Sequence, residues 1–465
     1  MHRLMLTLAA LLSIAAFALS PAPTAAQDKK DAEKPAAELT PVQKSNVAVL
    51  DGLFKAVRQS FYDKKYGGLN LNKLREKYLQ RVVESQPGAP LHKVLNELIA
   101  EFKVSHFGVM EGDVYAVNFA PEMNNTFSVR PGFDIGRLNG EYFVANVYHE
   151  GAAQKAGLLR GDRIVKVNGK PIEQSPLLVD AGSDPGIPGE PHFFLRVPDD
   201  ISEIVVDVQR ARSSSDLTAI SIKPSGINMI LSTKKSVSVI EYKGKRFGYI
   251  RFWHFLHDGM TAALRGALRK DWVDCDGLII DLRGRGGSPS VMNACFEPFG
   301  KPPALGRMWG PASYNMPKWT KPVVALQDAG SRSAKEVYAH NWKYLKIGPL
   351  VGETTPGAVL GSNFVELPDG SQMIMPMQEV GALTYGNVQL EANGVVPTHP
   401  VKDLLAFAAG GDTIKDAGIK VLYELVLAQP EEAKPVTPPD QGPPADSGDE
   451  EEFSLGPLGG CFAGR

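Results

Sequence analysis

The sequence predicts a multidomain protein of mixed α+β and α/β architecture, with a helical N-terminal region, a β-rich middle segment and an α/β core. At 465 residues the chain is too long for one ordinary core, because domains usually hold about 100–200 residues. Apolar residues recur every three or four residues in the N-terminal region and every second residue in the middle segment. Beyond it, strand-like and helix-like patterns alternate. The composition, 43% hydrophobic and 22% charged, is typical of a globular protein.

Compositional shifts divide the chain into six segments. We expect a signal peptide (1–26), a flexible polar linker (27–41), a helical region (42–112), a β-rich domain (125–224), an α/β core (237–428) and a Pro-rich, acidic, disordered tail (429–465). The formal net charge of −2 gives no electrostatic reason to expect a nucleic acid or an anionic membrane surface as partner.

The N-terminus has the features of an export signal. His2 and Arg3 precede the apolar run LMLTLAALLSIAAFALS, and the small residues Thr24 and Ala26 offer a cleavage site before Gln27. A membrane anchor is the alternative, but the run is shorter than the roughly 20 apolar residues of a span. We therefore expect an exported protein, periplasmic or extracellular, without a stable membrane span.

Periodicity predicts the elements in chain order. Three amphipathic helices are expected in the helical region, over 47–63, 71–85 and 91–103. The β-rich domain has alternating runs at 141–148, 163–169 and 203–210, a short helix that ends at Gly161, and a Gly- and Pro-rich surface insertion at 179–192. The core has apolar strands of the buried parallel kind at 246–255, 275–284, 321–328 and 348–354, helices at 259–272 and 333–346, and a hairpin at 363–377.

The three cysteines, Cys275, Cys295 and Cys461, are an odd number and form no disulfide framework. One structural disulfide is compatible with the sequence but not required. Cys275 and Cys295 are better interpreted as small buried residues. Since no Cys-x-x-Cys or His-rich spacing accompanies them, neither a metal nor an organic cofactor is expected.

A glycine-rich turn, Gly284 to Gly287, follows the buried strand in LIIDLRGRGGS. Such a turn exposes backbone N–H groups at the carboxyl end of a strand, where α/β proteins place their ligands. One interpretation is an oxyanion hole. The other is a tight turn that needs glycine for positive φ.

The stretch DAGSRSAKEVYAH places Ser331, Ser333 and Lys335 at the start of a predicted helix. A serine there has its hydroxyl near the positive end of the helix, as a nucleophile would. It is equally an N-cap, because Glu336 three residues after Ser333 completes a capping box. By itself the cap is the better interpretation.

Together these motifs resemble peptidase family S41, the tail-specific or C-terminal processing peptidases. The resemblance extends over about 46–402 and rests on Ser-His at 105–106 and on RPGFDIG, AQKAGLLRGDRIVKVNG, GYIRFWHF, IIDLRGRGG, SRSAKE, GETTPGA and LEANGVVP. It implies a PDZ-like domain in the β-rich segment and a ClpP/crotonase-like α/β peptidase core. The family's nucleophile is the serine of a Ser-Ala-x-Glu run, which matches Ser333, so Ser331 becomes a turn residue.

One departure from this resemblance indicates the base. Members with a serine–lysine dyad have a lysine where GETTPGA has Ala358, and Lys335 points away from Ser333 along the helix. The tricorn-like S41B branch instead uses a Ser-His-Ser-Glu tetrad, which Ser105, His106 and Glu391 would complete with Ser333.

The resemblance also implies roles for backbone groups. The Gly286 and Ala334 N–H groups would face the oxyanion, and Gly132, Phe133 and Ile135 would form the peptide-binding loop of the PDZ-like domain. We therefore expect an exported serine endopeptidase that acts on proteins or peptides through an acyl-enzyme, with no metal.

The alternative is an inactive peptide-binding or scaffolding protein of the same fold. In that case His106 is an ordinary core histidine and Glu391 a solvated strand residue. The oligomeric state stays open.

Overall fold

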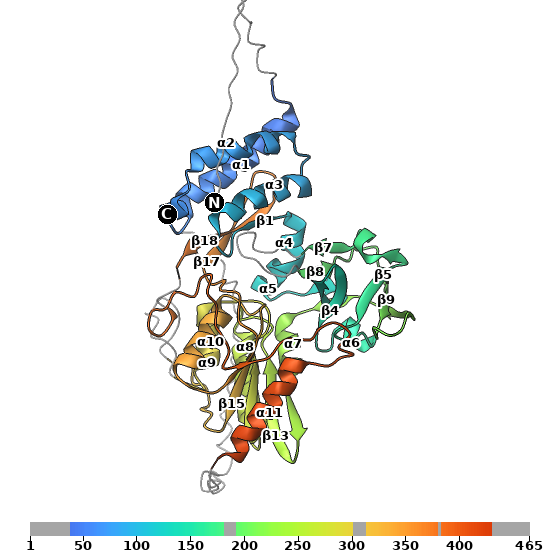
Figure 1. The fold of residues 1–465 in the computed structure, drawn as a ribbon, viewed down its shortest axis with the longest axis vertical. Helices are drawn as coiled ribbons and strands as arrows, with labels where there is room; N and C mark the ends of the chain where they lie inside the picture. Colours follow the sequence, from blue (N-terminus) through green and yellow to red (C-terminus); the bar gives the residue numbers. More distant parts are fainter. Residues whose placement is uncertain (1–37, 181–191, 301–312, 380–382, 430–465) are drawn as a thin grey trace, which may run out of the picture.

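The computed structural model describes residues 38–180, 192–300, 313–379 and 383–429. The expected signal peptide, most of the linker, most of the surface insertion, the acidic tail and Cys461 lie outside these ranges. Helices occupy one end of the described chain, the α/β core occupies the other, and the β-rich domain lies beside their junction (Figure 1). Within these ranges no helix is both long and apolar enough to cross a membrane, and no group of three or more His, Cys, Asp or Glu residues could hold a metal ion.

Three amphipathic helices form the N-terminal layer, as predicted: α1 (Pro41–Ser60), α2 (Leu71–Glu84) and α3 (Ala89–Ile99). The Thr40 hydroxyl accepts from the Gln43 N–H at the start of α1, and Asn70 caps α2 in the same way. The apolar faces of the three helices share one core. After α3 the chain passes through a 3-10 turn to Ser105 and His106.

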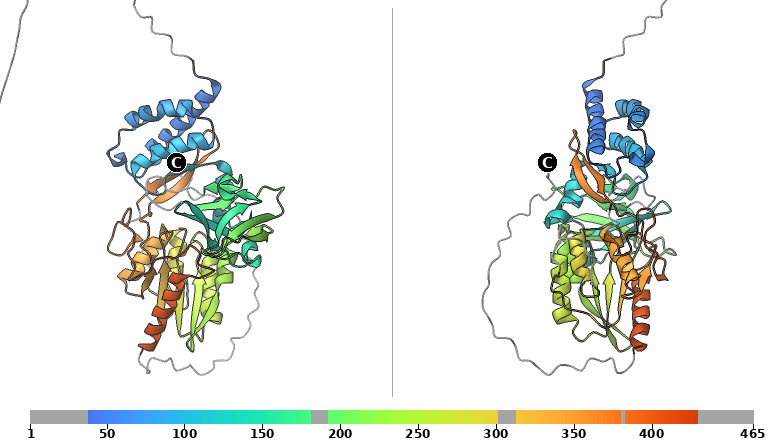
Figure 2. Two further views of the ribbon diagram at one scale, coloured as in Figure 1. Left: turned by 45° about the vertical axis from the view of Figure 1, so that its right-hand side comes forward. Right: turned by 90° about the vertical axis from the view of Figure 1, so that its left-hand side faces the viewer.

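A hairpin from the far end of the chain completes this helical layer. Strands β17 (Gly361–Glu366) and β18 (Gln372–Gln378) pair antiparallel, as predicted, and β18 also pairs with β1 (Gly108–Met110). Met373 and Met375 on β18 are fully buried among the side chains of the three helices. The hairpin lies in the sequence between strands of the α/β core, but it packs on the N-terminal helices and not on the core sheet (Figure 2).

The β-rich domain is built on an eight-stranded sheet with the order β10-β9-β5-β4-β3-β8-β7, in which the short β6 pairs with β5. Its strands are β3 (Phe133–Leu138), β4 (Glu141–Val147), β5 (Arg163–Val167), β6 (Lys170–Pro171), β7 (Leu178–Asp180), β8 (His192–Leu195), β9 (Ile204–Gln209) and β10 (Thr218–Ile222). The predicted short helix, α6 (Ala152–Lys155), ends before Gly157 and not at Gly161, because Gly157 already takes a left-handed φ of 82°.

Short elements join the three parts of the chain. These are α4 (Gly112–Asn118), α5 (Ala120–Asn124), β2 (Ser128–Arg130), β11 (Ser225–Ile227) and α7 (Met229–Ser236). Strands β2 and β11 pair with each other and close the β-rich domain at its base.

The α/β core is a six-stranded sheet whose spatial order follows the chain: β12 (Ser238–Tyr242), β13 (Lys245–Arg251), β14 (Gly277–Asp281), β15 (Val323–Gln327), β16 (Leu350–Gly352) and β19 (His399–Pro400). All neighbours from β13 onward are parallel, and β12 is an antiparallel edge. Cys275 and Cys295 are free and buried, as predicted.

Helices cover both faces of this sheet. One face carries α8 (Gly259–Gly266, continued by a π-helical turn), α9 (Pro289–Phe296) and α10 (Ala334–Tyr344), and the other carries α11 (Thr413–Leu427). On β14, Leu278 and Ile280 pack toward the first face and Ile279 toward the second, as the two-residue period of a strand requires.

Because the N-terminal helices and the hairpin share one core, we expect Met373→Ala to destabilise both. We expect the free energy of unfolding of this layer to fall by about 2–5 kcal/mol, the usual range for truncating a buried methionine. Hydrogen exchange should show faster exchange in α1–α3 as well as in β17 and β18. The exposed Glu366→Ala on β17 is the matched control. Loss of protection confined to the hairpin would contradict a common core.

Candidate active site

The candidate nucleophile Ser333 lies at the junction between β15 and α10, at the edge where the parallel strands end. Ligands of open α/β sheets bind at this edge. Ser333 is half-buried, and its φ of 56° falls in a region that non-glycine residues rarely adopt. Such a conformation costs on the order of 1–3 kcal/mol and concentrates at active sites. The Ser333 N–H donates to the Ala358 carbonyl at 2.7 Å, which holds the residue in place.

The glycine-rich turn after β14 lies directly against Ser333. A Cβ added to Gly286 would come within 2.8 Å of the Ser333 Cβ, so only glycine fits at this distance. The Gly286 carbonyl accepts from the Phe255 N–H at 2.9 Å. In the described part of the chain no hydrogen bond uses the N–H of Gly286 or that of Ala334, the first residue of α10. The two N–H groups expected to face an oxyanion are therefore available beside the serine.

Ser105, His106 and Glu391 form a continuous hydrogen-bonded chain. The Glu391 carboxylate accepts from the Ser105 N–H at 2.7 Å and from the Ser105 hydroxyl at 3.0 Å. The Ser105 Oγ lies 2.8 Å from His106 Nδ1. Because the Ser105 hydroxyl donates its one proton to Glu391 Oε2, its oxygen accepts at His106, and Nδ1 is assigned as the protonated nitrogen of that ring. A neutral His106 then has its lone pair on Nε2, as a general base requires.

One peptide group connects this chain to the nucleophile. The carbonyl of the Ala358–Val359 peptide accepts from the Ser333 N–H, and its Val359 N–H donates to Glu391 Oε2 at 3.0 Å. Ala358, which stands where a lysine occurs in serine–lysine relatives, is buried next to Ser333. The residue that lacks a basic side chain, Ala358, is thus directly connected through its peptide group to the hydrogen-bonded network of His106.

His106, Gly286, Ser333 and Ala334 all line a single large cleft of about 2490 Å³. The helical layer, the β-rich domain and the α/β core each contribute to its walls. Ser105 and Glu391 lie behind His106, outside the lining. The fold therefore brings the predicted nucleophile and base, which are more than two hundred residues apart, to one cavity.

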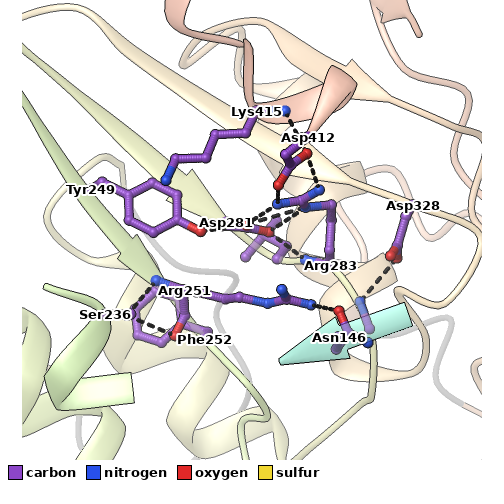
Figure 3. Close-up of polar contacts among 12 residues, drawn as sticks. Asn146, Ser236, Tyr249, Arg251, Phe252, Asp281, Arg283, Asp328, Asp412 and Lys415 are labelled. Carbon is purple, nitrogen blue, oxygen red and sulfur yellow. Dashed lines mark hydrogen bonds and ion pairs between the residues drawn. The ribbon is translucent and has the colours of Figure 1, made fainter. Parts of the chain in front are cut away.

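Charged residues beneath the glycine-rich turn anchor its start (Figure 3). Arg283 donates to Asp281 at the end of β14 and, at 2.7 Å, to Asp412, which caps α11. Burial raises the pKa of Asp281, but the guanidinium groups of Arg283 and Arg251 outweigh it and hold that pKa well below its usual range. The Asp328 carboxylate accepts from the Gly284 N–H at 2.9 Å. The start of the turn is thereby tied to the sheet and to α11.

Glu336 has a larger role than the capping box alone indicates. Its buried carboxylate accepts from the Thr355 hydroxyl at 2.6 Å and from the Gly357 and Ala358 N–H groups at 2.7 Å. Burial raises the pKa of Glu336 to about 7 against these hydrogen bonds. Glu336 therefore fixes the GETTPGA loop on the nucleophile helix. The sequence analysis missed this because the partners are some twenty residues away and no local pattern marks them.

Ser331 is a buried turn residue, as predicted. Its hydroxyl contacts the Leu282 carbonyl at 3.1 Å and Asp328 Oδ1 at 2.9 Å, and it lies outside the cleft lining.

The predicted peptide-binding residues of the β-rich domain lie away from the cleft. Phe133 and Ile135 are buried in the core of that domain, and Gly132 packs against the start of α6. Strand β8 pairs with β3 at Ile135 and Gly136, on the edge opposite β4. That is the edge to which a peptide strand would add, and the chain's own strand occupies it. Asp134 and Gly136 of β3 nevertheless line the cleft.

Comparison with known proteins identifies three segments. Residues 246–401 match peptidase family S41, residues 143–179 match a PDZ domain, and residues 48–100 match the tricorn protease C1 domain. Tricorn protease homolog 2 of Streptomyces coelicolor is 26% identical over 414 residues, which is 83% of this chain and 32% of the relative. The carboxy-terminal processing protease CtpB of Bacillus subtilis is 25% identical over 316 residues, 65% of this chain and 61% of the relative.

The chain thus spans about a third of the first relative and under two thirds of the second. Among solved structures, mature CPAF complexed with lactacystin aligns with a TM-score of 0.51 at 12% identity, over 84% of this chain and 100% of that one. This likeness supports the shared fold. From these matches and the fold, we conclude that residues 246–401 of this chain are similar to peptidase family S41, and that a PDZ domain and a segment similar to the tricorn protease C1 domain precede them.

Proposed function

We propose that this protein is a serine endopeptidase that hydrolyses peptide bonds through an acyl-enzyme on Ser333, with His106 as the base. The observation that carries the proposal is the chain from Glu391 through Ser105 to His106 Nδ1, because it leaves the lone pair of neutral His106 on Nε2. His106 and Ser333 also line the same cleft. The alternative, an inactive scaffold, offers no reason for a buried serine, a buried histidine and a half-buried glutamate to be connected in this order.

In the proposed reaction the Ser333 Oγ attacks the peptide carbonyl carbon while His106 Nε2 takes the hydroxyl proton. The negative charge that develops on the carbonyl oxygen is met by the Gly286 and Ala334 N–H groups. When the tetrahedral intermediate collapses, the C–N bond breaks and the leaving amine takes the proton from His106. Water then attacks the ester carbonyl carbon and gives a proton to His106, the C–O bond to Ser333 breaks, and His106 returns the proton to the Ser333 Oγ.

Glu391 acts through Ser105 in this scheme. When His106 is protonated, its Nδ1–H stays donated to the Ser105 Oγ, and the Ser105 hydroxyl in turn donates to the Glu391 carboxylate. The negative charge of Glu391 therefore stabilises the imidazolium across one hydroxyl group, and the two hydrogen bonds fix the orientation of the ring.

Substrates are proposed to be extended peptide segments or unfolded proteins, since the cleft is large and all three parts of the chain contribute to its walls. Presentation by the PDZ domain through strand addition to β3 would require β8 to leave the edge at Ile135 and Gly136. We also propose that the protein is exported, to the periplasm or the extracellular side, on the basis of residues 1–26.

Substitution of the two reacting groups tests the reaction. We expect Ser333→Ala and His106→Ala to lower hydrolysis of fluorescently labelled casein by at least about 10⁴-fold, since removal of either group disables the nucleophile. Fluorophosphonate labelling of the wild type should map to Ser333. Ser238→Ala and His340→Ala, outside the cleft lining, are the matched controls. Equal turnover in all five proteins would overturn the peptidase assignment.

Glu391→Gln should leave the fold intact and lower kcat by about 10²-fold or more, because an amide cannot stabilise the imidazolium. Ser105→Ala should act on the same step, so the double variant should lose no more than the worse single variant. Independent, multiplying losses would show that the two residues do not form one relay to His106.

Disruption of the β3–β8 pairing tests presentation by the PDZ domain. Phe193→Pro removes a backbone donor from β8 and should raise the affinity for a labelled extended peptide, measured by fluorescence anisotropy on the Ser333→Ala background. Unchanged affinity would argue that peptides do not add to this edge.

A further inference from the structure

Lys335 is a buried lysine whose ammonium group contacts backbone carbonyls and not a carboxylate. Its side chain is fully buried, and its Nζ lies within hydrogen-bond distance of four backbone carbonyls. Two belong to the residues that directly follow β13, Phe252 at 2.6 Å and Trp253 at 3.4 Å. Two belong to the start of the glycine-rich turn, Arg283 at 3.3 Å and Gly284 at 2.5 Å. In the described ranges no carboxylate forms an ion pair with this lysine.

A buried ammonium without a carboxylate partner is costly, so it must perform a task that an apolar side chain could not. Burial, with a smaller effect of Arg251, lowers the pKa of Lys335 to about 7, against the opposing charges of Asp328 and Asp281. Packing alone would be better served by leucine or methionine at this position of α10. What the ammonium adds is donors for carbonyls that would otherwise be buried without partners.

The carbonyls it holds are next to the oxyanion site. Gly284 is two residues before Gly286, and Lys335 itself follows Ala334. The turn is flexible by composition, and Gly284 and Arg285 both have left-handed φ values, 68° and 48°. Other hydrogen bonds also hold the turn: the Gly284 N–H donates to Asp328, the Arg285 carbonyl accepts from the Arg332 N–H at 3.4 Å, and the Gly286 carbonyl accepts from the Phe255 N–H.

We propose that Lys335 is a positioning residue for the oxyanion site, which ties the glycine-rich turn to the first turn of the nucleophile helix and so aims the Gly286 N–H. This role rests on the proposed function, because it concerns the same peptide hydrolysis. Lys335 does not take the serine proton in this scheme; it acts only through the backbone of the turn.

The test compares Lys335→Met, Lys335→Gln and the wild type in kcat, KM and inhibitor binding. We expect Lys335→Met to lower kcat by about 10- to 100-fold with KM within about twofold, since loss of a whole oxyanion donor costs about 10²–10³-fold. A peptide aldehyde, which forms a tetrahedral adduct, should bind more weakly in proportion to kcat. The corresponding peptide amide should bind as in the wild type. Lys335→Gln keeps N–H donors and should fall between the two.

Lys321→Met is the matched control, since Lys321 also donates to a backbone carbonyl, that of Cys275 at 2.8 Å, in the same domain but outside the cleft lining. A Lys335→Met enzyme with wild-type kcat and aldehyde affinity would overturn the proposal. So would a loss as complete as that of Ser333→Ala, which would make Lys335 part of proton transfer, or failure of both Lys335 variants to fold, which would make it a residue of global stability. If the wild type shows no Ser333-dependent turnover, the proposed function fails instead.

Discussion

The Glu391 carboxylate joins two layers of this protein that are distant in sequence. It accepts hydrogen bonds from Ser105, which follows the N-terminal helices, and from Val359 in the α/β core. Because the Val359 N–H and the carbonyl that holds Ser333 belong to one peptide group, the same short structure fixes both sides of the reaction. The geometry of the candidate site depends on this one half-buried carboxylate, which accepts hydrogen bonds from both layers.

Several non-glycine residues around the site have positive φ values. His106, Arg285, Ser333 and Ala392, which follows Glu391, all have positive φ values, between 48° and 62°. Each is a reacting group of the proposed mechanism or a direct neighbour of a site residue. Non-glycine residues hold such conformations only where surrounding contacts over-determine them. The contacts of Glu391, Glu336 and Lys335 supply that determination here.

The PDZ domain is joined firmly to the same turn. Arg285, next to Gly286, forms ion pairs with Glu122 on α5 and with Asp134 on β3, and it donates to the Tyr148 hydroxyl at 3.1 Å. Burial lowers the pKa of Arg285, but the charges of Glu122 and Asp134 outweigh this and raise it well above its usual range. Asp134 precedes Ile135, the residue of β3 that pairs with β8. The ion pair between Asp134 and Arg285 therefore connects the β8 edge of the sheet to the glycine-rich turn.

The resemblance to peptidase family S41 supplied the four candidate residues of the proposed tetrad. The sequence by itself determined the order of elements, the parallel core and the three amphipathic helices. These depend on local periodicity and on motifs whose residue types are dictated by chemistry, so they are visible in one dimension. The tertiary structure alone decided that hairpin 361–378 packs on the helices, that β8 occupies the edge of β3, and that Lys335 holds the glycine-rich turn. Each of these depends on contacts between groups tens to hundreds of residues apart, and the free energy of such contacts is set by shape and burial in three dimensions, which no local pattern encodes.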